Sequence, residues 1–127
     1  MTTVMIHAGA ARVRLQLTDA MRQLAQIIPS GSDPLRTLRA HKPDVLLIAV
    51  RRRDRRASLS LAQRLKTDGR SPPLLGLIDP RCVLSDPIAA CTRAQADGCL
   101  QGELSTERLA ALLQGLQQPE PCVIGTL

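Results

Sequence analysis

Short, wholly apolar segments alternate along the chain with segments whose apolar residues recur every three or four positions. The clearest apolar run covers residues 45–50, which are apolar at every position. A strand of this kind has both faces covered, as in a parallel sheet flanked by helices. Shorter runs predict further strands at residues 4–6, 74–78 and 98–100.

Helical periodicity fills the intervals between these strands. After the first strand, apolar residues share one helical face over residues 13–28. A second strand at residues 26–28 is the alternative for the end of this segment. Another helix follows the central strand with apolar residues over 61–65, and Asp68-Gly69 ends it.

Three further helix starts are marked by capping residues. Asp33 and Asp86 each precede a proline, and this pair supplies an N-cap carboxylate and a residue suited to the first helical position. Ser105 caps the last helix, which ends before Pro119. The alternation of strands and helices predicts an α/β fold in three layers, with a parallel sheet between two layers of helices.

Length and composition fit one globular domain. The chain has 127 residues, of which 44% are hydrophobic and 22% are charged. We assign residues 1–118 to the domain and residues 119–127 to a linker or the start of a further segment. No apolar stretch approaches the ~20 residues of a membrane span, and no basic segment precedes an apolar run at the N-terminus. We therefore expect a cytoplasmic protein without a membrane partner.

Charge and aromatic content narrow the expected partners. The net charge of +6 comes mostly from arginine, which indicates an acidic partner or a nucleic acid. The chain has no Phe, Tyr or Trp, although single-stranded nucleic acids are usually bound by stacking bases on aromatic rings. No helix combines basic and amide side chains on one face for reading DNA bases. Direct nucleic-acid binding is therefore disfavoured.

Cysteine and histidine spacing argues against a metal site. The four cysteines form no C-x-x-C pair, and both histidines lie far from them in sequence. We expect the cysteines to be small buried side chains, with no metal and no cofactor. These residues are Cys82, Cys91, Cys99, Cys122, His7 and His41.

Several segments together carry a resemblance to a known family. Residues 42–48 read Lys-Pro-Asp-Val-Leu-Leu-Ile, and residues 96–100 read Ala-Asp-Gly-Cys-Leu. With the helical segments 61–66 and 104–116 and the apolar segment 73–77, this pattern resembles the receiver domain of two-component response regulators. The resemblance implies a flavodoxin-like three-layer sandwich whose five-stranded parallel sheet has the order 2-1-3-4-5, in a protein of signal transduction.

The resemblance also implies which positions would carry phosphoryl transfer, and none of them holds a competent side chain. Receivers use an acidic pair that holds Mg²⁺, an acceptor aspartate, a hydroxyl residue and a lysine. The corresponding positions are, in that order, His7-Ala8 (or Ala8-Gly9), Ala49, Ile78 and Gly102. An alanine methyl group cannot accept a phosphoryl group, so we expect no enzymatic or phosphoryl-transfer chemistry here.

Other polar residues fall at the same predicted edge of the sheet. Asp54, Asp79 and Glu103 lie in loops there, where they would either gather around a ligand or neutralise nearby arginines. We favour neutralisation. We expect His7 to be partly buried and bonded to the backbone, because no other histidine or cysteine lies near it in sequence.

A dense run of arginines directly follows the central strand. The carboxyl edge of an open parallel sheet is where ligands bind, and guanidinium groups hold phosphates or carboxylates with paired hydrogen bonds. The run therefore predicts either a docking patch for an acidic partner or anion, or a solvated loop that keeps the protein in solution. Its members are Arg51, Arg52, Arg53, Arg55 and Arg56.

The leading hypothesis is a non-catalytic, phosphorylation-independent receiver-like module of a signalling or transcription regulator, with a protein partner or a second copy as its target. From the resemblance, the contact surface is the face of the fourth helix, fifth strand and fifth helix. It includes the neighbourhoods of Ile88, Cys91, Leu104 and Leu112.

Two alternatives remain open. The first is a flavodoxin-like domain that binds an anion or phospho-ligand through the arginine run, with Asp79 or Glu103 converging on a pocket at the sheet edge. The second is the N-terminal domain of a DNA-binding response regulator, whose output domain would follow Leu127.

Overall fold

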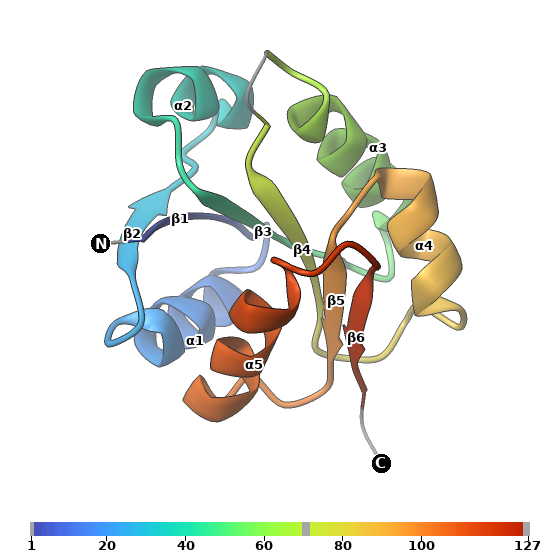
Figure 1. Ribbon diagram of the computed structural model, residues 1–127. Coiled ribbons are helices and arrows are strands. Elements are labelled where there is room, and N and C mark those ends of the chain that lie inside the picture. The colour runs from blue at the N-terminus through green and yellow to red at the C-terminus, as the bar shows by residue number, and fades with distance from the viewer. Residues whose placement is uncertain (1, 70–71, 126–127) are drawn as a thin grey trace.

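One sheet of six parallel strands carries helices on both faces in the computed structural model, which describes residues 2–69 and 72–125 (Figure 1). The strands are β1 (Thr3–His7), β2 (Gln26–Pro29), β3 (Val45–Ala49), β4 (Leu74–Asp79), β5 (Gly98–Gln101) and β6 (Cys122–Ile124), in the order β2-β1-β3-β4-β5-β6. The helices are α1 (Ala11–Met21), α2 (Pro34–His41), α3 (Arg55–Lys66), α4 (Pro87–Ala94) and α5 (Thr106–Gly115). Within the described ranges, every helix falls short of the length and apolarity that a membrane crossing requires.

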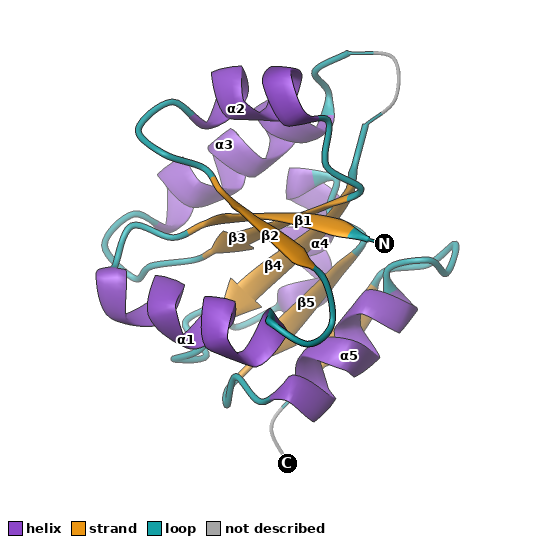
Figure 2. Ribbon diagram, turned by 90° about the vertical axis from the view of Figure 1, so that its left-hand side faces the viewer, coloured by secondary structure: helices purple, strands orange, loops and turns teal. Residues whose placement is uncertain are grey.

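The sheet separates two apolar layers. Helices α2, α3 and α4 cover one face, and α1 and α5 cover the other (Figure 2). Along β3, Leu46 and Ile48 pack in the α2–α4 layer, whereas Val45, Leu47 and Ala49 pack in the α1–α5 layer. Every residue of β3 is buried, so the prediction of a central strand covered on both faces is confirmed, as is the three-layer α/β architecture.

The segment after the first strand contains both a helix and a strand. The helix α1 ends at Met21, and the following chain forms β2, with Ile27 opposite Val4 of β1. The prediction of one helix over residues 13–28 is therefore confirmed as far as Met21 and wrong beyond it, where its alternative, a second strand at residues 26–28, is confirmed. The β-branched Ile27 and its neighbour suit a pleated strand, although their spacing also fits a helical face.

The predicted N-caps are confirmed. In each of α2, α4 and α5, the cap side chain accepts a hydrogen bond from the third backbone N–H beyond it. These bonds run from Arg36 to Asp33, from Ala89 to Asp86 and from Arg108 to Ser105. All three caps follow the carboxyl ends of strands, so they fix where the loops at that edge of the sheet end.

The predicted count of five strands is wrong, because β6 adds a sixth at the edge beside β5 (Figure 1). It lies within residues 119–127, which the sequence suggested as a linker; residues 126 and 127 of that segment lie outside the described residues. The Arg108 guanidinium of α5 donates to the carbonyl oxygens of Gln101, Ile124 and Gly125. This side chain therefore joins the end of β6 to the end of β5. The prolines on either side of Glu120 favoured a linker, and this tertiary contact could not be read from sequence.

Two carboxylates tie neighbouring strands together at the opposite, amino edge of the sheet. Asp44 accepts hydrogen bonds from the backbone N–H and the hydroxyl of Thr3, which lower the pKa of this carboxyl group. Asp97 accepts from the backbone N–H of Leu75 and from the Lys66 ammonium, with 2.7 Å between Nζ and Oδ2. The aspartates of the Pro-Asp and Ala-Asp-Gly motifs, on which the resemblance rested, therefore stabilise the sheet by joining neighbouring strands.

Candidate functional site

The loops that follow β1, β3, β4 and β5 meet at the carboxyl edge of the sheet, where the sequence placed its candidate site residues. At the centre of this edge, Ala49 ends β3 opposite Ile78 of β4 and is only 6% exposed. It belongs to the same apolar cluster as Ile6, Ala8 and Ile78. The position expected for a phosphoryl acceptor is thus part of the hydrophobic core, and no atom of its side chain can form a bond to phosphorus.

His7 is half-buried at the end of β1 and bonds to a side chain. Its Nδ1 lies 2.7 Å from the hydroxyl oxygen of Ser30, which is buried. The expectation of a backbone partner for His7 is therefore wrong; Ser30 follows β2, the neighbouring strand in space, and its nearness could not be seen from sequence. Burial lowers the pKa of His7, which favours the neutral imidazole.

Gly102 occupies the position that the resemblance assigns to a lysine. Its φ is +93°, a conformation that glycine adopts readily and other residues resist. Its backbone N–H donates to the carbonyl oxygen of Asp79 at 3.0 Å, which fixes this turn. The loop is therefore shaped for a residue without a side chain.

Asp79 is fully buried and is held by its own loop. Its carboxylate accepts hydrogen bonds from the backbone N–H groups of Val83 and Leu84 and from Nε2 of Gln101, each at 2.9 Å. These bonds satisfy the charge and shape the β4–α4 loop. The expectation that Asp79 converges on a ligand pocket or neutralises an arginine is wrong, and Gln101 is a partner that the sequence analysis missed.

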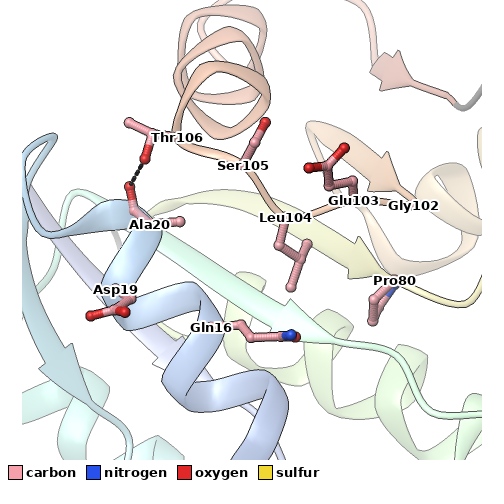
Figure 3. A pocket seen from close by; sticks show the side chains of 9 residues that line it. All are labelled: Gln16, Asp19, Ala20, Pro80, Gly102, Glu103, Leu104, Ser105 and Thr106. Carbon is pink, nitrogen blue, oxygen red and sulfur yellow. Dashed lines mark hydrogen bonds between the residues drawn. The ribbon is translucent and has the colours of Figure 1, made fainter.

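Glu103 lines a hollow of about 640 Å³ between α1 and the β5–α5 loop, which we call the acidic hollow (Figure 3). The hydroxyl of Thr106 donates to the carbonyl oxygen of Ala20 and links the two walls. The carboxylates of Glu103 and Asp19 give this hollow an acidic lining, and none of its described lining residues is basic. Its full lining is Gln16, Asp19, Ala20, Pro80, Gly102, Glu103, Leu104, Ser105 and Thr106.

Arginines surround a second hollow at the same edge, of about 370 Å³, which we call the arginine hollow. The start of α1 and two loops, β3–α3 and β4–α4, form its walls. Pro80 lines both this hollow and the acidic one, so the two lie next to each other. The arginine hollow is lined by Ala10, Arg12, Val13, Val50, Arg51, Arg52, Arg53, Pro80, Arg81 and Val83.

The structure divides the predicted arginine run. Its first three members line the arginine hollow, whereas Arg55 and Arg56 begin α3. Arg12 and Arg81 complete the hollow, and the sequence analysis missed both. A signal for them existed, because each follows the carboxyl end of a strand by a few residues and so had to emerge at the same sheet edge as the run.

Asp54 is the carboxylate closest to the run in sequence. Its Oδ2 lies 3.8 Å from Nη1 of Arg51, and both side chains are about half exposed. This long ion pair agrees with the expectation that Asp54 neutralises a nearby arginine, but it involves Arg51 alone. The Arg51 side chain also lies over Gly9: its Nη1 is 2.9 Å from the point where a Cβ on residue 9 would stand.

The side chains of the types that commonly bind metals do not form a metal site in the described part of the chain. Among the described residues, no group of three or more histidine, cysteine, aspartate or glutamate side chains could hold an ion. Cys91 and Cys99 are buried as expected, whereas Cys82 is exposed and Cys122 half-buried, so the expectation of burial is wrong for these two.

The expected interaction face contains both exposed and buried residues. Ile88, on the outer side of α4, is 60% exposed and is one of the few large apolar side chains at the surface. Cys91 and Leu112 are fully buried, so their side chains belong to the core and cannot contact a partner. Leu104 is half-buried and lines the acidic hollow.

Several solved structures share this architecture. A response regulator from Thermotoga maritima matches with a TM-score of 0.75 and 17% sequence identity, over 91% of this chain and 97% of that one. A CheY-like protein (tadZ) from Pseudomonas aeruginosa matches with a TM-score of 0.74 and 18% identity, over 91% of this chain and 99% of that one. The BeF3-activated DrrB receiver domain matches with a TM-score of 0.71 and 16% identity, over 93% and 99%.

At the level of sequence, no family model and no curated protein gives a match. The three solved structures each align with more than 90% of this chain at TM-scores of 0.71 to 0.75. The chain therefore has the fold of response-regulator receiver domains.

Proposed function

We propose that this chain is a regulatory domain with the receiver fold that acts by binding a protein partner and takes up no phosphoryl group. The observation that carries the proposal is Ala49, an alanine buried in the core at the end of β3. Phosphoryl transfer needs a nucleophilic oxygen at the acceptor position, and a methyl group offers none. As proposed, the domain is not an enzyme.

The surroundings of Ala49 support the same proposal. The positions expected to hold Mg²⁺ carry His7 and Ala8, and a magnesium ion needs oxygen ligands. The arginine hollow that opens beside this edge would repel a divalent cation. The β5–α5 turn holds Gly102 at a positive φ, where a lysine would be strained.

A partner surface is available on α4. Ile88 is exposed there although the opposite side of the same helix is packed in the core through Ala90, Cys91 and Ala94. An apolar side chain on an otherwise polar surface gains free energy when a partner covers it. We propose this helix as the contact surface, for a second copy or for another protein of a signalling pathway.

The proposal can be tested by thermal unfolding with beryllofluoride, which mimics a bound phosphoryl group. The melting temperature is measured with Mg²⁺ alone, with beryllofluoride alone and with both, and the BeF3-activated DrrB receiver serves as the positive control. A ligand raises the melting temperature of the state that it binds. We expect no rise that requires both additives. A Mg²⁺-dependent rise of several degrees, as for the control receiver, would contradict the proposal.

A further inference from the structure

We propose that the arginine hollow is a binding site for a small polyphosphate anion, that is, a ligand with at least two adjacent phosphate groups. This inference goes beyond the proposed function, because an anion held here by hydrogen bonds and charge needs no acceptor residue. Binding of the anion would let a small molecule regulate the domain without any covalent modification.

The first support is a concentration of positive charge that carboxylates compensate only in part. Arg12, Arg51, Arg52, Arg53 and Arg81 line the hollow, and none of its described lining residues carries a carboxylate. The nearest ion pair is the 3.8 Å contact between Arg51 and Asp54. Five guanidinium groups, from the start of α1 and two neighbouring loops, give this hollow a concentrated positive charge, and each can donate two parallel hydrogen bonds to phosphate oxygens.

The second support comes from the start of α1, which opens onto the same space. Its N-cap is Ala10, whose side chain has no atom that can accept a hydrogen bond from the first turn. The first backbone N–H groups of a helix lack partners within the helix, and the helix dipole is positive at this end. The caps of α2, α4 and α5 carry aspartate or serine, so this bare terminus is unlike theirs.

The third support is that one arginine of the hollow, Arg12, lies where a helix disfavours a positive charge. Arg12 stands in the first turn of α1, which has no acidic residue there, and it lines the hollow. Cations at a helix N-terminus oppose the dipole. Local choices that work against stability are expected where a binding site requires them.

The size and chemistry of the hollow select the ligand. A volume of about 370 Å³ is at the small end of the range for small-molecule sites, which suits a compact ligand. Two or three linked phosphates supply enough negative charge for several guanidinium groups, whereas one phosphate carries only about −2. The chain has no aromatic residue on which a nucleic-acid base could stack.

Isothermal titration calorimetry with sodium tripolyphosphate, at constant ionic strength and without divalent cations, tests the site. The test variant is R12Q/R81Q, which removes the two arginines outside the run. The control is R36Q/R64Q, which removes the same charge from exposed positions on α2 and α3 that do not line the hollow. We expect the test variant to bind roughly 10-fold or more weakly, as the loss of charge-assisted hydrogen bonds implies, and the control to stay within about twofold.

Three results would overturn the inference: no binding by the wild-type chain, equal weakening in both variants, or tighter binding of a DNA duplex than of tripolyphosphate at equal phosphate concentration. Inorganic phosphate should bind much more weakly than tripolyphosphate. The melting temperature of each variant without ligand checks that it is folded, and R81Q alone replaces the double variant if that one is not. Failure here leaves the beryllofluoride result unaffected, so the two proposals can fail separately.

Discussion

Gln101 of β5 donates a hydrogen bond from its Nε2 to Oδ2 of the buried Asp79 on β4, at 2.9 Å. The same nitrogen donates to the carbonyl oxygen of Leu84, also at 2.9 Å. The amide therefore joins a strand end to the loop that returns from β4 to α4. At this edge of the sheet, where a phosphorylated receiver would need reactive groups, the buried carboxylate is engaged in holding the backbone.

Replacing Asp79 with asparagine should destabilise the fold. In either orientation the new amide places an N–H group against one of two backbone donors, those of Val83 and Leu84. Leaving a buried donor without an acceptor costs about 1–3 kcal/mol. Urea unfolding should show a loss of that size for D79N and less than about 0.5 kcal/mol for the exposed control D19N. Equal effects of the two substitutions would show that the network contributes little.

His7 should make stability depend on pH. Burial lowers the pKa of His7 in the folded state below its unfolded value of about 6.5. The unfolded chain then binds more protons between these two pKa values, so stability is complete above about pH 6.5 and falls as the pH drops toward the folded pKa. Unfolding measured from pH 7.5 to 5.5 should show this slope in the wild type and in the exposed-site control H41Q, and a smaller slope in H7Q. An unchanged slope in H7Q would exclude His7 as its source.

The buried thiols should resist alkylation. A hydrogen bond with Cys91, together with burial, raises the pKa of the Cys99 thiol, and both side chains are inaccessible. Because the reagent must reach the sulfur and neither side chain is accessible, iodoacetamide should modify neither residue in the native protein and both in urea. Peptide mass spectrometry gives the rates, with exposed Cys82 as the reference. Native-state modification of Cys99 as fast as that of Cys82 would contradict this packing.

The sequence predicted the layered fold because its strongest signals are local. The uniformly apolar β3 and the caps Asp33, Asp86 and Ser105 each determine structure through nearby residues alone. The segments β2 and β6 depend instead on pairing with distant strands. Ile27 fits a helical face as well as a strand, and β6 is joined to the domain through Arg108, so neither could be assigned from its own residues.

The candidate site was predictable in part. The absence of an acceptor was visible at Ala49, because the resemblance to receiver domains aligns this residue with the acceptor position. The role of His7 was not, since its partner Ser30 lies 23 residues away in sequence. For Asp79, the partner Gln101 lies 22 residues away, and the bonds from the nearby backbone of Val83 and Leu84 depend on the shape of the loop. The arginine hollow required the start of α1 and two loops to be placed together, and only the part of it that is contiguous in sequence, residues 51–53, could be recognised.

The central claim is that this domain cannot be phosphorylated, and intact-protein mass spectrometry after incubation with acetyl phosphate and Mg²⁺ tests it most directly. The DrrB receiver, treated in parallel, controls for the donor. The account predicts an unchanged mass for this chain. An added mass of about 80 Da, the mark of one phosphoryl group, that hydroxylamine removes would contradict it.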